Sequence, residues 1–304
     1  MTAATTYEEL RWACATHNRA GRHEEALACA EEAWRRFPEQ RHYSWWLVAY
    51  ANVALGRLSD AVDALEAAEA ENRLWRIGMM RSPVMEPLGH EPRFADLLTR
   101  AEARIAACGF RPRLLVAEPD PPDPGAPLLL GLHGATSIAE DYHPHWLPAS
   151  ALGCIVASAQ STQPAKEDAF CWDDREQARR DVAALLPQLP VHGVVVLTGF
   201  SQGAAVALDL ALADDVVRAS GVIGVGPSYP PSTSFPAARR PLHVVILRGA
   251  DDPWGRSIPG TVEALRTAGH RVHVDEVPGL GHDYPADFAE RLPGLLAAAG
   301  LRTS

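Results

Sequence analysis

The sequence has few cysteines, and none of them is paired with another at short spacing. The five cysteines are Cys14, Cys29, Cys108, Cys154 and Cys171. A disulfide framework or a zinc site normally brings cysteines together in pairs such as C-x-x-C, and the sequence contains no such pair. We therefore expect reduced thiols, and the sequence implies neither a metal nor an organic cofactor.

The sequence also lacks an excess of basic residues and any long apolar run. Its 28 Lys and Arg residues are outnumbered by 38 Asp and Glu residues, which gives a formal net charge of -10. That charge repels a phosphate backbone, so we expect no binding to nucleic acid. No apolar run approaches the length of a membrane span, and the opening MTAATTYEEL is acidic where a secretory signal would be basic. These absences predict a cytoplasmic protein without a membrane anchor.

Residues 1–107 carry a helical pattern. From Tyr7 onward, apolar residues recur at helical spacing in a segment rich in Ala, Glu, Arg and Leu. The segment 20–33 aligns with 55–68 at a shift of about 35 residues, which is close to the repeat length of helix-turn-helix arrays. The equivalent pairs are Gly21 and Gly56, Ala26 and Ala61, Ala33 and Ala68, and Leu10 and Trp45. This pattern resembles the tetratricopeptide repeat.

The resemblance covers two repeat units. Residues 73–107 are interpreted as a degenerate third unit or a cap, because two repeats alone seldom give a stable array. A generic bundle of helical hairpins is the alternative interpretation. In either case, we expect an all-helical first domain over residues 1–107.

Residues 108–304 follow a different pattern, in which short apolar runs alternate with amphipathic segments. This alternation is typical of a mostly parallel sheet covered by helices. The proline-rich stretch 118–127 is interpreted as a loop between neighbouring strands, because apolar runs flank it on both sides. We expect strands within 113–117, 127–134, 153–160, 193–200, 220–226, 242–249 and 271–279. Helices are expected at 174–187, 202–213, 257–269 and 285–299.

The pentapeptide GFSQG, residues 199–203, follows the apolar run VVVLT. Gly-x-Ser-x-Gly between a strand and a helix is the nucleophile elbow of serine hydrolases, in which a strained turn exposes the serine hydroxyl. Ser201 is therefore the candidate nucleophile. A serine is weakly nucleophilic at neutral pH, so this assignment requires a base and a carboxylate that orients the base.

Candidates for both partners follow Ser201 in the order that α/β hydrolases use. Asp251 or Asp252 comes after the predicted strand 242–249, and His282 comes after the predicted strand 271–279. His243 and His273 lie inside predicted strands, so we expect structural roles for both. In this fold the residue after the nucleophile donates one amide to the oxyanion, and that residue is Gln202.

Four motifs together resemble the phospholipase/carboxylesterase family, the relatives of acyl-protein thioesterases. They are LHG at 132–134, GFSQG at 199–203, GADDP at 249–253 and GLGH at 279–282. The resemblance covers residues 110–300 and implies an α/β-hydrolase fold. It selects Asp252 as the acid, since the family's acid lies three residues after a glycine. It also implies that the amide of Ala135 is the second oxyanion donor, that Gly134 shapes that turn, and that His133 is structural.

The same resemblance bears on the acyl pocket. FCWDD at 170–174 is similar to the family segment that lines this pocket, so Trp172 is a candidate wall residue, and a core tryptophan is the alternative. The sequence departs from the family at two places close to the expected catalytic residues. Ala204 replaces a second glycine after the elbow, and DYP follows His282 where a short polar residue is usual.

The leading hypothesis is a serine hydrolase that cleaves a small-molecule carboxylic ester or thioester through an acyl-enzyme. One alternative is a peptidase or amidase that uses the same triad, because the pocket and not the triad sets the substrate. Another is a protein-binding scaffold whose hydrolase domain is inactive, although the intact triad argues against it. Three roles for the helical domain stay open: binding a protein partner, self-association, or a lid over the site.

Overall fold

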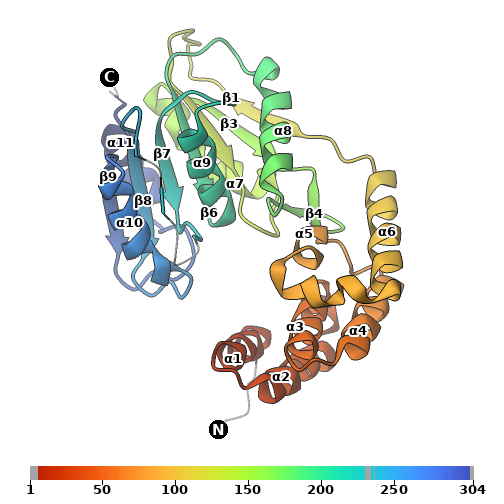
Figure 1. Cartoon of the computed structure of the whole chain (residues 1–304). Coiled ribbons are helices and arrows are strands. Elements are labelled where there is room, and N and C mark those ends of the chain that lie inside the picture. Colours follow the sequence, from red (N-terminus) through yellow and green to blue (C-terminus); the bar gives the residue numbers. More distant parts are fainter. Residues whose placement is uncertain (1–5, 230–233, 236, 302–304) are drawn as a thin grey trace. The chain divides into compact units, whose positions relative to one another are not determined.

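The computed structural model describes residues 6–229, 234, 235 and 237–301. The chain divides into two compact units, Met1–Phe110 with Pro164–Asp168, and Arg111–Gln163 with Ala169–Ser304. The first hundred or so residues are helical, and the second unit combines a mostly parallel sheet with helices (Figure 1). The predicted fold class is therefore confirmed.

The helical unit consists of antiparallel helices joined by short turns. Its helices are α1 (Tyr7–Arg19), α2 (His23–Arg36), α3 (Arg41–Ala54), α4 (Leu58–Ala70), α5 (Ile77–Met80) and α6 (Pro92–Ala107), with 3-10 turns η1 (Pro38–Gln40) and η2 (Pro83–His90). Thr6 and Glu9 form a capping box that satisfies exposed amides at the start of α1.

The first two helix pairs repeat the same local geometry. Gly21 and Gly56 close the turns α1–α2 and α3–α4 with φ angles of 70° and 72°, a left-handed conformation that favours glycine. The other equivalent residues are all buried, namely Ala26, Ala61, Ala33, Ala68, Leu10 and Trp45. The small alanines let the paired helices approach closely, so the equivalences found in the sequence correspond to equivalent positions in the fold.

The third segment is less regular than the first two pairs, because it contains a single turn of α-helix, a 3-10 stretch and the long helix α6. Its apolar side chains complete the core of the helical unit by packing with those of α3 and α4. The residues contributed by this segment are Leu74, Met80, Met85, Leu88, Phe94, Leu97 and Ala101. The segment therefore shares one apolar core with α3 and α4.

The second unit is built on a seven-stranded sheet of order β1-β3-β2-β6-β7-β8-β9. Only β1 is antiparallel to its neighbour. The strands are β1 (Arg113–Ala117), β2 (Leu128–Leu132), β3 (Ile155–Gln160), β6 (Val195–Phe200), β7 (Ala219–Val225), β8 (His243–Gly249) and β9 (Arg271–Val277). A separate hairpin consists of β4 (Gln163–Lys166) and β5 (Ala169–Cys171).

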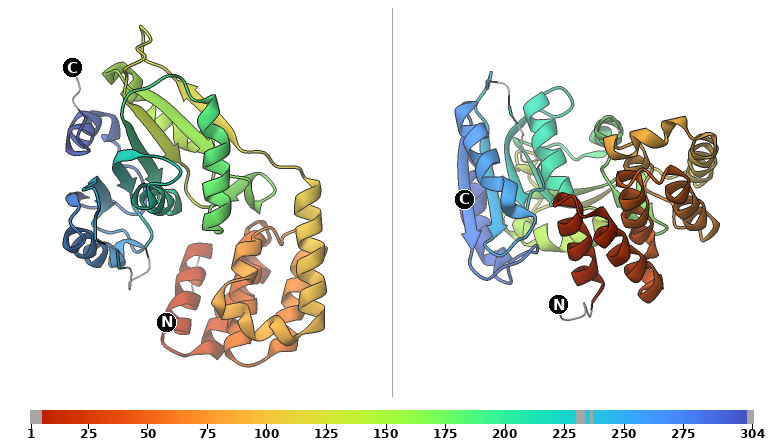
Figure 2. Two further views of the ribbon diagram at one scale, coloured as in Figure 1. Left: turned by 45° about the horizontal axis from the view of Figure 1, so that its top comes forward. Right: turned by 60° about the horizontal axis from the view of Figure 1, so that its bottom comes forward.

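Helices cover both faces of the sheet (Figure 2). Alternate residues of β2 point to opposite faces, so Leu128 and Leu130 join one core cluster and Leu129 joins the other. The first cluster includes side chains of α8 (Arg175–Leu185), α9 (Gln202–Ala213) and α10 (Ile258–Thr267). The second includes side chains of α7 (Ala139–Trp146) and α11 (Phe288–Ala298). Burial on both faces explains why the central strands are continuously apolar.

Each predicted strand and helix of this unit is present, but three features differ from the predictions. The loop 118–127 joins β1 and β2, which are not neighbours, because β3 lies between them and pairs with both. The β4–β5 hairpin was not predicted, because these strands are short and lie in a polar stretch. Helix α7 was not predicted either, because Pro144 and its aromatic residues obscure the helical pattern.

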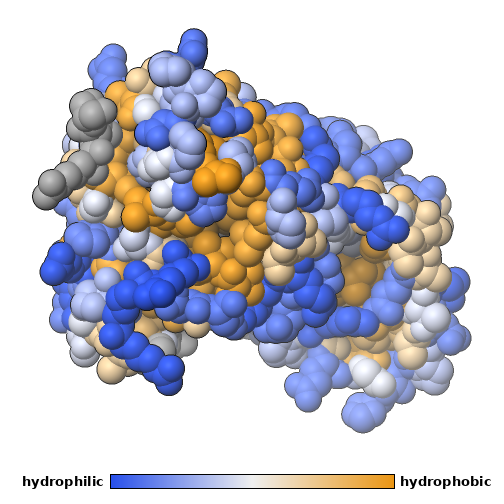
Figure 3. Space-filling model, turned by 90° about the horizontal axis from the view of Figure 1, so that it is seen from above, coloured by the Kyte–Doolittle hydropathy of each residue, from blue (hydrophilic) through white to orange (hydrophobic). Residues whose placement is uncertain are grey.

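The amino ends of the strands lie opposite the edge that carries the candidate site. A hollow of about 330 Å³ opens there, and its lining is mostly apolar, including Leu128, Leu189, Val194 and Val217. Figure 3 shows apolar side chains gathered on one face of the molecule.

None of the helices among the described residues is both long enough and apolar enough to cross a membrane.

Candidate active site

Ser201 lies in the sharp turn between β6 and α9, with φ 52° and ψ -116°. Such a conformation is strained for a residue with a side chain. The glycines two residues before and two residues after Ser201 have no room for a side chain. A Cβ on Gly199 would lie 2.5 Å from the amide nitrogen of Ala204, and a Cβ on Gly203 would lie 2.2 Å from the carbonyl oxygen of Leu132. The elbow therefore depends on close backbone packing at both glycines and on a positive φ at the serine.

Ala204 occupies the position where the family usually has a second glycine. Its side chain is buried and faces Gly224 of β7, where even an added Cβ would come within 3.2 Å of the Ala204 methyl. The glycine in the neighbouring strand thus provides the room that the methyl group needs, so the departure leaves the elbow intact.

The structure brings Ser201, His282 and Asp252 into one chain of hydrogen bonds. The Nε2 atom of His282 lies 2.9 Å from the Oγ atom of Ser201, and its Nδ1 atom lies 2.8 Å from the Oδ2 atom of Asp252. The second carboxylate oxygen, Oδ1, accepts a hydrogen bond from the Trp254 amide at 2.8 Å. Asp251, the other candidate acid, is exposed, and its carboxylate has no such contact with His282.

These three residues meet because the strands that precede them run parallel, so their carboxyl ends lie at one edge of the sheet. Two glycines let the loops approach each other there. A Cβ on Gly249 would lie 2.1 Å from the carbonyl oxygen of Leu280, and Gly226, with φ 53°, lies directly beside the His282 ring. Larger residues at either position would push the histidine loop away from the nucleophile.

A buried hydrogen-bond network centred on His133 supports the loop after β2. Its Nδ1–H donates to the Gly134 carbonyl at 2.8 Å. Its Nε2 accepts from the backbone N–H of Ser161 at 3.3 Å and lies 3.2 Å from the side-chain Nε2 of Gln160. Burial lowers the pKa of His133 to about 4, so the ring is neutral at pH 7. His133 therefore supports this loop and lies outside the hydrogen-bond chain of Ser201, His282 and Asp252.

Trp172 has no exposed surface, so here it is a core residue and does not face a solvent-filled pocket. Its indole N–H donates to the His133 carbonyl at 2.9 Å, and its ring packs on that imidazole with centroids 5.0 Å apart. The Gln202 side chain links the elbow to the same segment, because it accepts from the Trp172 amide at 2.8 Å and donates to Asp173 at 2.7 Å. These contacts fix the elbow relative to the loop after β2.

Gly134 and Ala135 follow His133 at the end of β2. Gly134 is buried against the elbow, and a Cβ on it would lie 2.8 Å from the Phe200 ring. Ala135 is partly exposed next to it, and Thr136 has φ 60°. The loop thus turns sharply beside the elbow, where an amide donor for the oxyanion is expected.

An aromatic stack that the sequence did not predict supports the histidine loop. Tyr284 stacks on Phe200 with centroids 5.1 Å apart and on His145 at 3.9 Å, and its hydroxyl accepts from the Trp146 indole at 3.2 Å. Phe200 in turn packs on the His282 ring at 5.1 Å. The unusual DYP sequence was the only sign of this stack, since His145 and Trp146 come from the unpredicted helix α7.

The buried neutral state of His133 predicts a loss of stability in acid. Its folded-state pKa lies below the ordinary value of 6.5, so as pH falls the unfolded chain binds the proton first. The free energy of unfolding should be unaffected by this group above about pH 6.5 and should fall by up to about 3 kcal/mol on acidification to about pH 4. Urea unfolding at several pH values measures this slope.

A matched pair of variants isolates the contribution of His133. His133→Asn should unfold more easily at pH 7 but should lose stability less steeply between pH 6.5 and 4. His192→Gln, at a partly exposed position outside this network, should keep the wild-type slope. Equal slopes for His133→Asn and the wild type would show that His133 does not carry this pH dependence.

His243 and His273 lie in β8 and β9, as predicted, and neither joins the hydrogen-bond chain of Ser201, His282 and Asp252. Among the described residues, no group of three or more His, Cys, Asp or Glu side chains is arranged to hold a metal ion.

Comparison with protein families gives a match to the phospholipase/carboxylesterase model over residues 179–296. This segment is similar to the phospholipase/carboxylesterase family. It contains Ser201, Asp252 and His282, whereas the loop at 133–135 precedes it. No curated protein sequence matches the chain.

Two solved structures show a similar fold. An uncharacterized protein from Bacillus cereus ATCC 10987 has a TM-score of 0.51 at 20% identity, and the match covers 97% of this chain and 99% of that one. Esterase PE8 has a TM-score of 0.51 at 16% identity, with 62% of this chain and 100% of that one covered. The first match extends over the helical region as well as the phospholipase/carboxylesterase segment.

Proposed function

We propose that this chain is a serine hydrolase that cleaves a carboxylic ester or thioester through an acyl-enzyme. The observation that carries the proposal is the unbroken hydrogen-bond chain from Ser201 through His282 to Asp252, built on a strained elbow. The family match over the same residues supports it.

In this mechanism, the Ser201 oxygen attacks the acyl carbon while the Nε2 atom of His282 takes the hydroxyl proton. Asp252 accepts the Nδ1–H bond throughout, so it holds the correct tautomer and stabilises the imidazolium that forms. The backbone amides of Gln202 and Ala135 stabilise the oxyanion of the tetrahedral intermediate. His282 then protonates the leaving alcohol or thiol.

Deacylation repeats these steps with water as the nucleophile. His282 takes a proton from the water as it attacks the acyl-enzyme, and it returns that proton to Ser201 when the acid product leaves.

Hydrolysis of p-nitrophenyl esters of increasing acyl length tests this function. We expect turnover of the esters, with a rate that depends on the length of the acyl chain. The matching p-nitroanilides provide the amide comparison. Turnover of anilides with none of the esters would favour the amidase alternative and would contradict the ester proposal.

Tyr284→Ala should lower kcat for ester hydrolysis by about 10- to 100-fold with little change in KM, because loss of the stack lets the His282 loop shift. Tyr284→Phe keeps the ring and loses only the hydroxyl contact with Trp146, so it should retain kcat within about threefold. Steady-state kinetics on one ester measures both. Equal losses in the two variants would assign the effect to the hydroxyl and not to the stack.

A further inference from the structure

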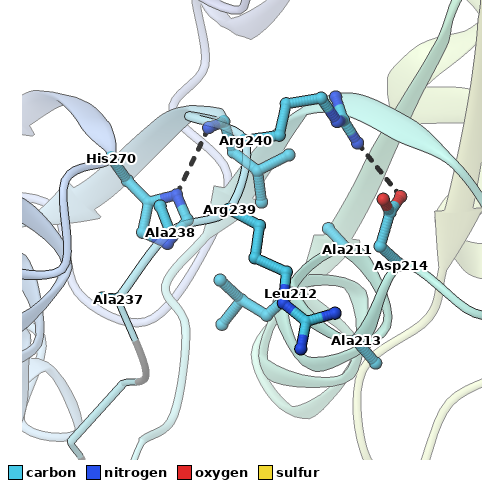
Figure 4. A pocket seen from close by; sticks show the side chains of 10 residues that line it. Ala211, Leu212, Ala213, Asp214, Ala237, Ala238, Arg239, Arg240 and His270 are labelled. Carbon is cyan, nitrogen blue, oxygen red and sulfur yellow. Dashed lines mark hydrogen bonds and ion pairs between the residues drawn. The ribbon is translucent and has the colours of Figure 1, made fainter.

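A pocket of about 400 Å³ lies at the opposite end of α9 from Ser201. Its ten lining residues come from the end of α9, the segment before β8, and the turn before β9, and none belongs to the triad (Figure 4). The residues are Ala211, Leu212, Ala213, Asp214, Ala237, Ala238, Arg239, Arg240, Leu242 and His270. The volume falls within the range of small-molecule sites.

The pocket contains one positive charge without a compensating partner. Arg240 donates to the Asp214 carboxylate at 3.0 Å and to the Ala219 carbonyl at 2.6 Å, so its charge is offset. Arg239 makes no hydrogen bond or ion pair with any described residue, and Figure 4 shows its side chain running toward Leu212 and Ala213 at the pocket. The charged groups that line the pocket therefore leave Arg239 available for an anion.

The pocket wall also contains two buried donors without acceptors. They are the Nε atom of Arg240 and the Nε2 atom of His270, two of the five buried side-chain atoms that lack a partner among the described residues. The Nδ1 atom of His270 accepts from the Leu242 amide at 3.2 Å, and burial lowers the pKa of the ring, so the proton of the neutral imidazole is on Nε2. All the unmet groups are donors, which favours a ligand that offers acceptors.

The rest of the lining is apolar. Six of the ten residues are alanine or leucine, so a fully hydrated ion such as inorganic phosphate would leave this surface without a partner. A second full charge on the ligand is also disfavoured, because Asp214 and the carbonyl end of α9 lie at the same pocket. Together these features favour a single negative charge attached to an apolar body.

We propose that this pocket binds a small monocarboxylate, with Arg239 as the partner of the carboxylate and the alanine and leucine side chains against its hydrocarbon part. A carboxylate is planar and matches the guanidinium fork in a bidentate arrangement. The site is separate from the triad, so it does not depend on the proposed hydrolysis.

The test is isothermal titration of the full chain with hexanoate, with hexan-1-ol and inorganic phosphate as comparison ligands. We expect saturable binding of hexanoate in the range of about 0.1–1 mM and binding at least about tenfold weaker for the other two. No saturable binding of hexanoate at millimolar concentration would overturn the proposal. Tighter binding of phosphate than of hexanoate would replace the monocarboxylate with a plain anion site and would also overturn it.

Three variants show whether binding occurs in this pocket. Arg239→Gln should weaken hexanoate binding by about tenfold or more, whereas Arg218→Gln, at another exposed arginine outside the pocket, should stay within about twofold. His270→Asn keeps an acceptor for the Leu242 amide but removes the Nε2 donor, so it should weaken binding about fivefold. Equal effects of the two arginine variants would show general charge attraction, and unchanged binding in both Arg239→Gln and His270→Asn would place the ligand elsewhere.

Discussion

Ser201→Ala should lower kcat for ester hydrolysis by about 10⁴-fold or more, with the fold unchanged. Without the hydroxyl there is no nucleophile for the acyl group, and only the oxyanion donors and substrate binding remain. The comparison is made on the best p-nitrophenyl ester at equal enzyme concentration. Circular dichroism and the urea midpoint confirm that the variant is folded.

Ser228 offers a matched control for this variant. Its backbone N–H donates to the Ser201 carbonyl at 3.4 Å, but its side chain is exposed. Ser228→Ala should therefore keep its activity within about threefold, because it removes a nearby hydroxyl that has no part in the proton transfer. If Ser201→Ala kept more than about a tenth of the wild-type rate, the elbow serine would not be the nucleophile.

Asp252→Asn should lower kcat by about 10³- to 10⁴-fold, the second largest effect that we expect. An asparagine amide facing the Nδ1 atom would favour the imidazole tautomer that carries its proton on Nε2. That tautomer cannot accept the Ser201 proton. The Asp252 carboxylate lies 2.8 Å from the Nδ1 atom of His282, and a neutral asparagine in its place would no longer stabilise the imidazolium. Kinetics between pH 6 and 9 measure the loss and any recovery at high pH.

Asp251→Asn is the control next in sequence. It removes the same charge one residue away, from an exposed carboxylate, so its kcat should stay within about threefold of the wild type. The difference between the two variants separates a specific hydrogen bond to His282 from the general effect of a nearby negative charge. Comparable losses would contradict the assignment of Asp252.

Much of the fold was predictable because its signals are local. Apolar runs ending in glycine fixed the strands that carry Ser201, Asp252 and His282, and parallel strands place their carboxyl ends at one edge. Gly21 and Gly56 likewise indicated the turns between α1 and α2 and between α3 and α4. The position of β3 between β1 and β2 was not predictable, since sheet order depends on contacts between residues far apart in the sequence.

The site was predictable in its residue types and order but not in its packing. The position after a strand left Asp251 and Asp252 open, the family resemblance selected Asp252, and in the structure it is Asp252 that contacts His282. Trp172 was equally consistent with a pocket wall and a core position, and the structure places it in the core. The support from Tyr284 depends on a stack formed with His145 of α7, which no local pattern revealed.

The two glycines of the elbow have a structural role that the spacing of the motif did not predict. Their spacing indicated a strained turn, and the strain is present at Ser201 itself. Gly199 and Gly203 are needed because other backbone atoms lie within 2.5 Å of where a Cβ would be. For Gly203 these atoms belong to Leu132 and His133 after β2, so the sequence of the elbow alone does not contain that requirement, whereas for Gly199 they belong to Gly203 and Ala204.

The most direct test of the central claim is labelling with a fluorophosphonate, followed by mass spectrometry of the intact chain and of its peptides. The reagent phosphonylates a serine only where a base activates the hydroxyl and an oxyanion site receives the phosphonyl oxygen. We predict a single adduct on the peptide that contains Ser201, formed at a rate that falls sharply in His282→Ala and with no adduct in Ser201→Ala. An adduct on another residue, or none on a chain that hydrolyses esters, would contradict the account.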